Sequence, residues 1–160
     1  MYTIWANDQL IQWLHSADET TWEEKRPSSF SSLNETTRHL WNAEYGWLTR
    51  LKDKPWESIP QVSTKDDVLN GWQTTSRALA KYGLSLLSND PNGTRRVGDG
   101  EMRIDDIIHH VCNHATYHRG QLITIGRQVG LNNPPRTDYV YFMQLDAQII
   151  ESYKRQVSAE

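Results

Sequence analysis

The sequence predicts an all-α protein, a four-helix bundle with an additional C-terminal helix. Apolar residues recur at helical spacing through four long segments, and no long stretch alternates apolar and polar residues as a strand would. Turn-forming residues separate these segments, while no internal repeat or low-complexity linker divides the chain. We therefore expect residues 1–160 to form a single domain, because this length can bury one sizeable core.

The first two helices are expected at residues 2–16 and about 33–52. In the first segment Trp5 and Trp13 fall on one side at helical spacing. Residues 18–32 contain Pro27 and four serines, so we expect them to be mostly loop. Ser32 followed by Glu35 is a capping-box pattern, which marks the start of the second helix.

The third helix is expected from Thr64, with Asp67 three residues later, to about residue 88. Pro55 and Pro60 bracket the loop before it. Residues 89–93 carry a strong turn signal. Residues 94–104 fit either a small hairpin around the Asp-Gly pair at 99–100 or an irregular loop.

The fourth helix is expected to begin at Asp105 or Asp106, and Gly130 is a natural C-terminal stop for it. After a loop at 132–135, Asp138 can cap one last helix that runs through Ile150. The fourth helix carries a broad apolar surface together with most of the histidines. It is therefore the helix on which a candidate site is sought.

Composition and charge exclude several classes of partner. The formal net charge is −3, with both signs mixed along the chain and no basic stripe, so nucleic acid is not expected to bind. No apolar run approaches the roughly 20 residues of a membrane span, and no signal-peptide pattern opens the chain. A single cysteine excludes an internal disulfide framework. We expect a cytoplasmic protein with no membrane partner.

Aromatic residues are biased toward the two types that carry a polar group. The chain has seven tryptophans and seven tyrosines but only two phenylalanines. Such side chains suit pocket walls and subunit interfaces, where one end is apolar and the other is not. For most of them we nevertheless prefer ordinary packing in the core.

Four of the six histidines lie in one stretch of ten residues within the fourth predicted helix. His110, His114 and His118 follow at steps of four, so they share one face within ~80°, whereas His109 is rotated away. Two imidazoles one turn apart can bind a single metal ion. The alternative is a polar pair on a solvated or hydrogen-bonded face. The apolar setting favours the ligand pair, because an unpartnered polar group is costly there.

A third ligand has to come from another helix, and His39 is the best candidate. Taken alone, its position beside apolar residues of the second helix would instead indicate a core histidine with a backbone partner. Ala115 follows His114, so the glutamate base of the His-Glu-x-x-His zinc proteases is missing. Cys112 lies about 160° around the helix from His114, which favours a small buried residue over a ligand.

Three motifs connect the chain with a known family: Tyr2-x-x-Trp5-Ala6-Asn7, a histidine in the second helix, and His114-x-x-x-His118-Arg119-Gly120-Gln121. With these the chain resembles the DinB-like family of helical metalloproteins, related to the YfiT-like proteins, over nearly its whole length. The resemblance implies a four-helix bundle of unusual connectivity, which is often a homodimer. It also implies a divalent-metal site whose ligands here are His39, His114 and His118. His110 then lies beside the site, and a ligand role for it stays open.

The resemblance also implies a class of chemistry. Related proteins include metal-dependent transferases and isomerases that use low-molecular-weight thiols. We expect a metal-dependent enzyme with zinc or nickel as cofactor and a small-molecule substrate, and thiol S-transfer or hydrolysis as its reaction. One alternative is a non-catalytic metal-binding stress-response protein. Another is a helical interaction module whose histidines are incidental.

No catalytic residue is assigned, but three side chains are candidates for a role near the metal. Glu35 and Asn42 lie one turn to either side of His39 and can orient a ligand or substrate. Their simpler roles are the capping box for Glu35 and a surface amide for Asn42. Arg119 can bind an anionic group, although an ion pair at the surface or between helices is its more common role.

Overall fold

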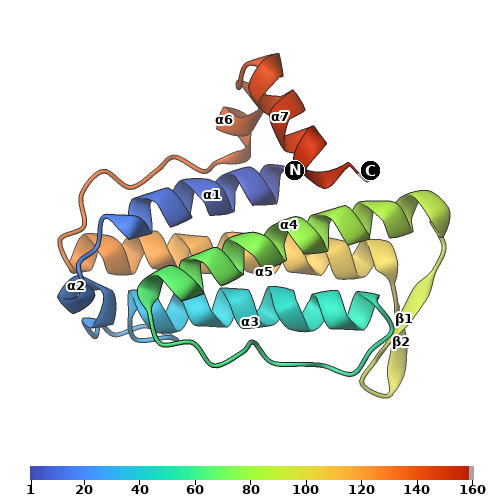
Figure 1. The fold of residues 1–160 in the computed structure, drawn as a ribbon, viewed down its shortest axis with the longest axis horizontal. Coiled ribbons are helices and arrows are strands. Elements are labelled where there is room, and N and C mark those ends of the chain that lie inside the picture. Colours follow the sequence, from blue (N-terminus) through green and yellow to red (C-terminus); the bar gives the residue numbers. More distant parts are fainter. Residues whose placement is uncertain (159–160) are drawn as a thin grey trace.

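Four long helices form the bundle in the computed structural model, which describes residues 1–158 (Figure 1). They are α1 (Tyr2–His15), α3 (Leu33–Leu51), α4 (Lys65–Asn89) and α5 (Ile104–Gln128). Helix α3 packs against both α4 and α5, and α1 packs against the same two helices. The predicted all-α bundle is confirmed, and the bounds of the four long helices agree with the sequence analysis to within about two residues.

The apolar stripes predicted from the sequence meet in the centre of this bundle. Leu14, Leu40, Leu69 and Leu122, one from each long helix, are fully buried in a common cluster. Removing one such side chain from water stabilises the fold by about 1.5–3 kcal/mol. Most tryptophans also serve the core, as preferred above, since the buried ones include Trp5, Trp13, Trp22, Trp41 and Trp72.

Hydroxyl groups cap the two helices whose starts the sequence marked. The Ser32 side chain accepts a hydrogen bond from the backbone N–H of Glu35 at 3.1 Å, and Thr64 accepts one from Asp67 at 3.1 Å. The return bond of the predicted capping box goes one residue further, from the N–H of Ser31 to the Glu35 carboxylate at 2.9 Å. The cap satisfies helix-end donors all the same.

The segment predicted as mostly loop contains a short helix, α2 (Glu19–Glu23). Asp18 caps it by accepting a hydrogen bond from the N–H of Thr21 at 2.7 Å, and Trp22 is buried at 1 % exposure. The hairpin alternative for residues 94–104 is the one the structure adopts. Strands β1 (Thr94–Val97) and β2 (Gly100–Arg103) pair antiparallel. Their turn is at residues 98–99, one position earlier than predicted, because Gly98 adopts a φ of +60°.

The prediction of one last helix is wrong, since the C-terminal part forms α6 (Tyr139–Met143) and α7 (Ala147–Val157). Asp146 caps α7 by accepting a hydrogen bond from the N–H of Gln148 at 2.7 Å, so a new helix starts where one helix was expected to continue. Both lie outside the bundle, with α6 against α1 and α7 against α4 (Figure 1). Within residues 1–158, none of the helices has the length and apolar character that crossing a bilayer requires.

Candidate metal centre

Three imidazole rings meet between α3 and α5. The Nε2 atom of His39 lies 3.1 Å from Nε2 of His114 and 3.1 Å from Nε2 of His118. Helix α5 presents its two histidines one turn apart, and α3 brings the third from 75 residues earlier in the chain. The structure therefore brings together all three residues that the sequence analysis singled out.

The donor set fits a cation better than it fits internal hydrogen bonding. An imidazole nitrogen carries either one proton or one lone pair in the ring plane, so His39 Nε2 cannot bond well to two other ring nitrogens. Three lone pairs directed at one point instead suit a metal ion. Nitrogens bound tetrahedrally to zinc at about 2.0–2.1 Å would lie about 3.3 Å apart, close to the spacing observed here.

Gln121 fixes the orientation of one ring. Its side-chain oxygen lies 2.6 Å from Nδ1 of His118. Because this oxygen can only accept, Nδ1 of His118 is the nitrogen that donates, and its Nε2 keeps a free lone pair. Such partners of a ligating histidine set its tautomer and raise its basicity. The sequence analysis missed this role, although Gln121 lies three residues after His118 on the same helix and so on the same side.

The three imidazoles are neutral near pH 7. Burial, followed by the neighbouring His118, lowers the pKa of His39 to about 4. Burial and the three surrounding histidines lower the pKa of His114 to about 4. Burial also lowers the pKa of His118, whereas the hydrogen bond that His118 donates to Gln121 acts in the opposite direction and raises it. The neutral form is the one that can donate a lone pair to a metal.

Aromatic rings and an open cavity border the cluster. Phe30 stacks on His39 with ring centres 4.0 Å apart, and the ring of Tyr117 meets that of His118 edge-on at 5.0 Å. A cavity of about 400 Å³ lies on the His39 side. Its walls are formed by Phe30, Glu35, Arg38, His39, Asn42, Ile59, Pro60 and Gln61. The volume is in the range of sites that bind small molecules.

Glu35 and Asn42 both border this cavity, but each has a structural task. The Glu35 carboxylate pairs with Lys25 and accepts hydrogen bonds from Ser31, and together these contacts lower the pKa of Glu35 to about 2. Asn42 accepts a hydrogen bond from the N–H of Ile59 at 3.1 Å, which ties the loop before α4 to α3. For Glu35 the simpler role favoured by the sequence is therefore the one seen.

His110 and Cys112 lie outside the group of three. The His110 ring is exposed, with its centre 5.9 Å from that of His114 and 5.1 Å from that of Trp47. Cys112 is half-buried, not buried as expected, and lines a different cavity.

Arg119 is buried at 1 % exposure, which the sequence analysis did not foresee. Its guanidinium donates to the side-chain oxygen of Asn7 at 2.9 Å and to the hydroxyl of Thr116 at 2.8 Å. Arg119 and Asn7 thus join α5 to α1 through hydrogen bonds between side chains, in place of an interhelix ion pair. Both belong to the motifs quoted above, and a polar residue within an apolar helical stripe was the available signal.

Comparison with known proteins identifies relatives of this chain. The model of the DinB family matches residues 1–155. The chain is 24 % identical over 155 residues to Protein DinB of Bacillus subtilis (strain 168). The aligned region covers 89 % of this chain and 90 % of that protein. It is also similar to the crystal structure of a DinB-like protein from Bacillus cereus ATCC 10987, with a TM-score of 0.65 and 17 % identity. That likeness covers 82 % of this chain and 89 % of the other, and it concerns the fold.

Proposed function

The chain belongs to the DinB family, and from this premise we propose that it is a metal-dependent enzyme whose divalent ion is held by His39, His114 and His118. The observation that supports the proposal is the convergence of three Nε2 atoms from two helices. Neutral nitrogen donors suit zinc or nickel, and these are the ions we propose. A three-histidine set leaves further coordination positions for water or substrate.

The proposed reaction is thiol S-transfer or hydrolysis on a small molecule. A divalent ion at such a site lowers the pKa of a thiol or water and so supplies a nucleophile at neutral pH. The chain's own residues supply orientation: Gln121 holds the His118 ring, and Phe30 covers the face of His39. Within the described residues no carboxylate joins the three histidines, so no acidic residue of the cluster is assigned as a base.

The position of Arg38 supports the proposal that the substrate carries an acidic group. It lines the cavity beside His39, where its guanidinium donates to the side-chain oxygen of Asn34 and to the backbone oxygen of Val62, both at 2.8 Å. These two bonds fix the position of the positive charge and leave further N–H groups of the fork for an anion. We propose that Arg38 positions a carboxylate of the substrate or of a low-molecular-weight thiol.

Metal analysis tests the site. Protein purified without a polyhistidine tag is expected to carry about one divalent ion per chain, measured by elemental mass spectrometry. His39→Ala and His114→Ala should each lose most of it. His109→Ala, which changes an exposed histidine on the same helix, should keep it. Full metal content in His114→Ala would overturn the site.

Activity assays then test the reaction. Metal-loaded protein is given a thiol with a model electrophile, and separately an activated ester, with apo protein and His118→Ala as controls. Turnover that needs both the metal and His118 is the expected result. Metal binding without turnover of either substrate would instead favour the non-catalytic metal-binding protein.

A further inference from the structure

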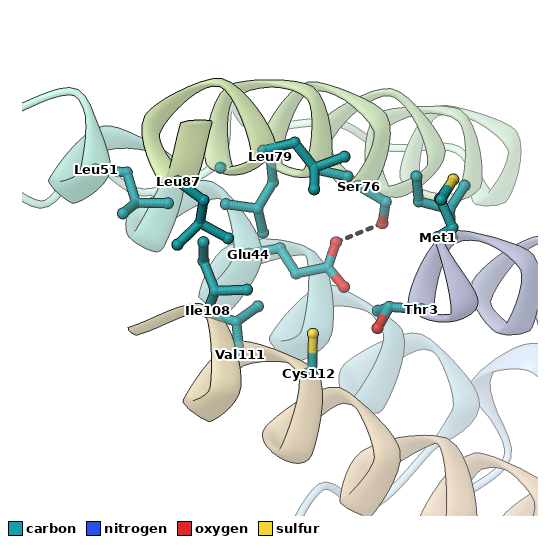
Figure 2. Close-up of a pocket in the computed structure, with 14 residues that line it drawn as sticks. Met1, Thr3, Glu44, Leu51, Ser76, Leu79, Leu87, Ile108, Val111 and Cys112 are labelled. Atoms are coloured by element: carbon teal, nitrogen blue, oxygen red, sulfur yellow. Dashed lines mark hydrogen bonds between the residues drawn. The ribbon is translucent and has the colours of Figure 1, made fainter. Parts of the chain in front are cut away.

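A second cavity lies between the beginning of α1 and the helices α3, α4 and α5 (Figure 2). It is on a different side of α3 from the histidines. Its volume is about 100 Å³. Glu44 enters it from α3, five residues after His39 and so about 140° around the helix. Most of its wall is apolar, formed by Leu51, Leu79, Leu84, Leu87, Ile108 and Val111.

Glu44 gives this apolar cavity one polar end. Figure 2 shows its carboxyl group turned toward Ser76 of α4, whose hydroxyl donates to Oε2. The amide of Asn7 donates to Oε1 at 2.9 Å. The residue is only 1 % exposed, and its burial raises the pKa of Glu44. The carboxyl group is therefore held in place within hydrocarbon surroundings.

The direct partners of this carboxyl group are neutral. In the part of the chain that the structure describes, no charged nitrogen of a lysine or arginine lies within 4.0 Å of a carboxylate oxygen of Glu44. A positive charge is relayed to it through Asn7, since Arg119 donates to the oxygen of Asn7 and the nitrogen of Asn7 donates to Glu44. A buried carboxylate is costly without a charged partner. Its oxygens can accept about four hydrogen bonds, which leaves room for a further donor.

We propose that this cavity binds a small primary amine, with its ammonium group on Glu44 and a short alkyl chain along the leucine-rich wall. The ammonium supplies a charged partner, so that the carboxyl group loses its proton to solvent on binding, and it donates to the free lone pairs of the resulting carboxylate. The alkyl chain moves from water to the apolar wall, which is favourable in proportion to the apolar area buried.

Size and access limit the amine to a short one. An apolar cavity of roughly 150 Å³ in another protein holds benzene, so the volume here corresponds to roughly four heavy atoms. Met1 and Leu84 line the cavity and are 36 % and 42 % exposed, so the cavity reaches the surface beside them. An amine of about four carbons has about one heavy atom more than this volume holds, so with its head at Glu44 its last carbon lies at this opening.

An NMR titration with n-butylamine hydrochloride near neutral pH tests the proposal. The amine is then fully protonated, since an alkylammonium such as that of lysine has a pKa of about 10.4. Backbone amide signals of Ala80, Gly83 and Cys112, which line the cavity, are expected to shift and saturate. Neutral n-butanol has the same chain and should bind about tenfold more weakly or less, because it lacks the charge.

Two variants test separately the contributions of the Glu44 carboxyl group and of the apolar cavity wall to amine binding. Glu44→Gln removes the charge at nearly constant shape and should weaken amine binding about tenfold. Ala80→Leu puts a larger side chain into the cavity, so the amine no longer fits and its chemical-shift changes should be abolished. Glu57→Gln, at an exposed glutamate, is the matched control and should bind like the wild type.

Two results would overturn the proposal. One is equal binding of n-butanol and n-butylamine by the wild type. The other is a set of shifts confined to exposed carboxylates, with the cavity signals unmoved. Both use the unaltered protein, so the test holds even where a variant does not fold.

Discussion

At the residue scale, the candidate metal site depends on which nitrogen of each imidazole carries its proton. Gln121 decides this for His118, through its 2.6 Å contact with Nδ1. We predict that Gln121→Ala lowers metal affinity by about 10- to 100-fold, as for other partners of ligating histidines, with little effect on folding. A titration with a competing chelator measures this.

The matched control for that experiment is Gln128→Ala, an exposed glutamine on the same helix. It should leave the chelator midpoint where it is in the wild type. An unchanged midpoint for Gln121→Ala as well would mean that the His118 ring is held by packing against Phe30 and Tyr117 alone.

Glu44 predicts a pH dependence of stability. Because burial raises its pKa above 4.5, the folded chain keeps a proton that the unfolded chain has already lost. This contribution to the free energy of unfolding is fully present below the unfolded pKa and is lost as pH rises through the folded pKa. We therefore expect the melting temperature of Glu44→Gln to gain on the wild type as the pH rises above the ordinary pKa of about 4.5.

Thermal melts at increasing pH, in the presence of a chelator, measure the difference between the two proteins. The comparison isolates Glu44, since the histidines titrate in both. Glu57→Gln should track the wild type at every pH, because that side chain is exposed. Parallel curves for Glu44→Gln and the wild type would show that the folded carboxyl group has an ordinary pKa.

At the element scale, the position of His39 depends on how α3 begins. Ser32 is fully buried and caps this helix through the N–H of Glu35. Ser32→Ala should lower the free energy of unfolding by about 1 kcal/mol, because it leaves a helix-end donor without its partner. Urea denaturation measures the loss, and Ser28→Ala, at an exposed loop serine, is the control. A loss no larger than that of the control would contradict the assigned cap.

The long helices could be predicted because periodicity and capping residues are local signals. Helix α2 could not, since it is stabilised by the burial of Trp22 among residues from other parts of the chain. The break between α6 and α7 comes from the cap at Asp146, a local signal that was not read as a helix start. Neither is visible in a pattern of apolar residues over a few positions.

The candidate site, too, could be predicted from the sequence only in part. The spacing of His114 and His118 alone places both rings on one face. The meeting with His39 depends on how α3 packs against α5, which the spacing does not contain. The sequence offered His39 as the best third candidate because it lies in another helix beside apolar residues, and the family resemblance then implied that it is a ligand. The stacking of Phe30 and the hydrogen bond of Gln121 required the structure.

At the scale of the whole molecule, the oligomeric state and the cytoplasmic location stay predictions. Helices α6 and α7 lie outside the bundle and carry four exposed apolar side chains, Tyr139, Val140, Met143 and Ile149. Exposed apolar residues that gather in one region favour association. We expect a homodimer in light scattering, with about twice the chain mass of 18.6 kDa.

The variant Val140→Asp tests whether this surface forms the dimer, because an unpaired carboxylate buried at an interface is costly. It should shift the mass toward the monomer, whereas Thr74→Asp, at an exposed position of α4, should not. A monomeric wild type at every concentration would refute the homodimer. A dimeric Val140→Asp variant would show that the surface on α6 is not the interface.

The three histidines also link metal binding to the stability of the whole bundle, because they join α3 to α5. An ion that binds only the folded chain adds about 4 kcal/mol when its free concentration is about 1,000 times Kd. For a chain of this length that corresponds to about 8–16 °C in Tm. Chelation should therefore lower the melting temperature of the wild type by about 10 °C and leave that of His39→Ala unchanged. His109→Ala should respond like the wild type, so an equal response of His39→Ala would place the ion elsewhere on the chain.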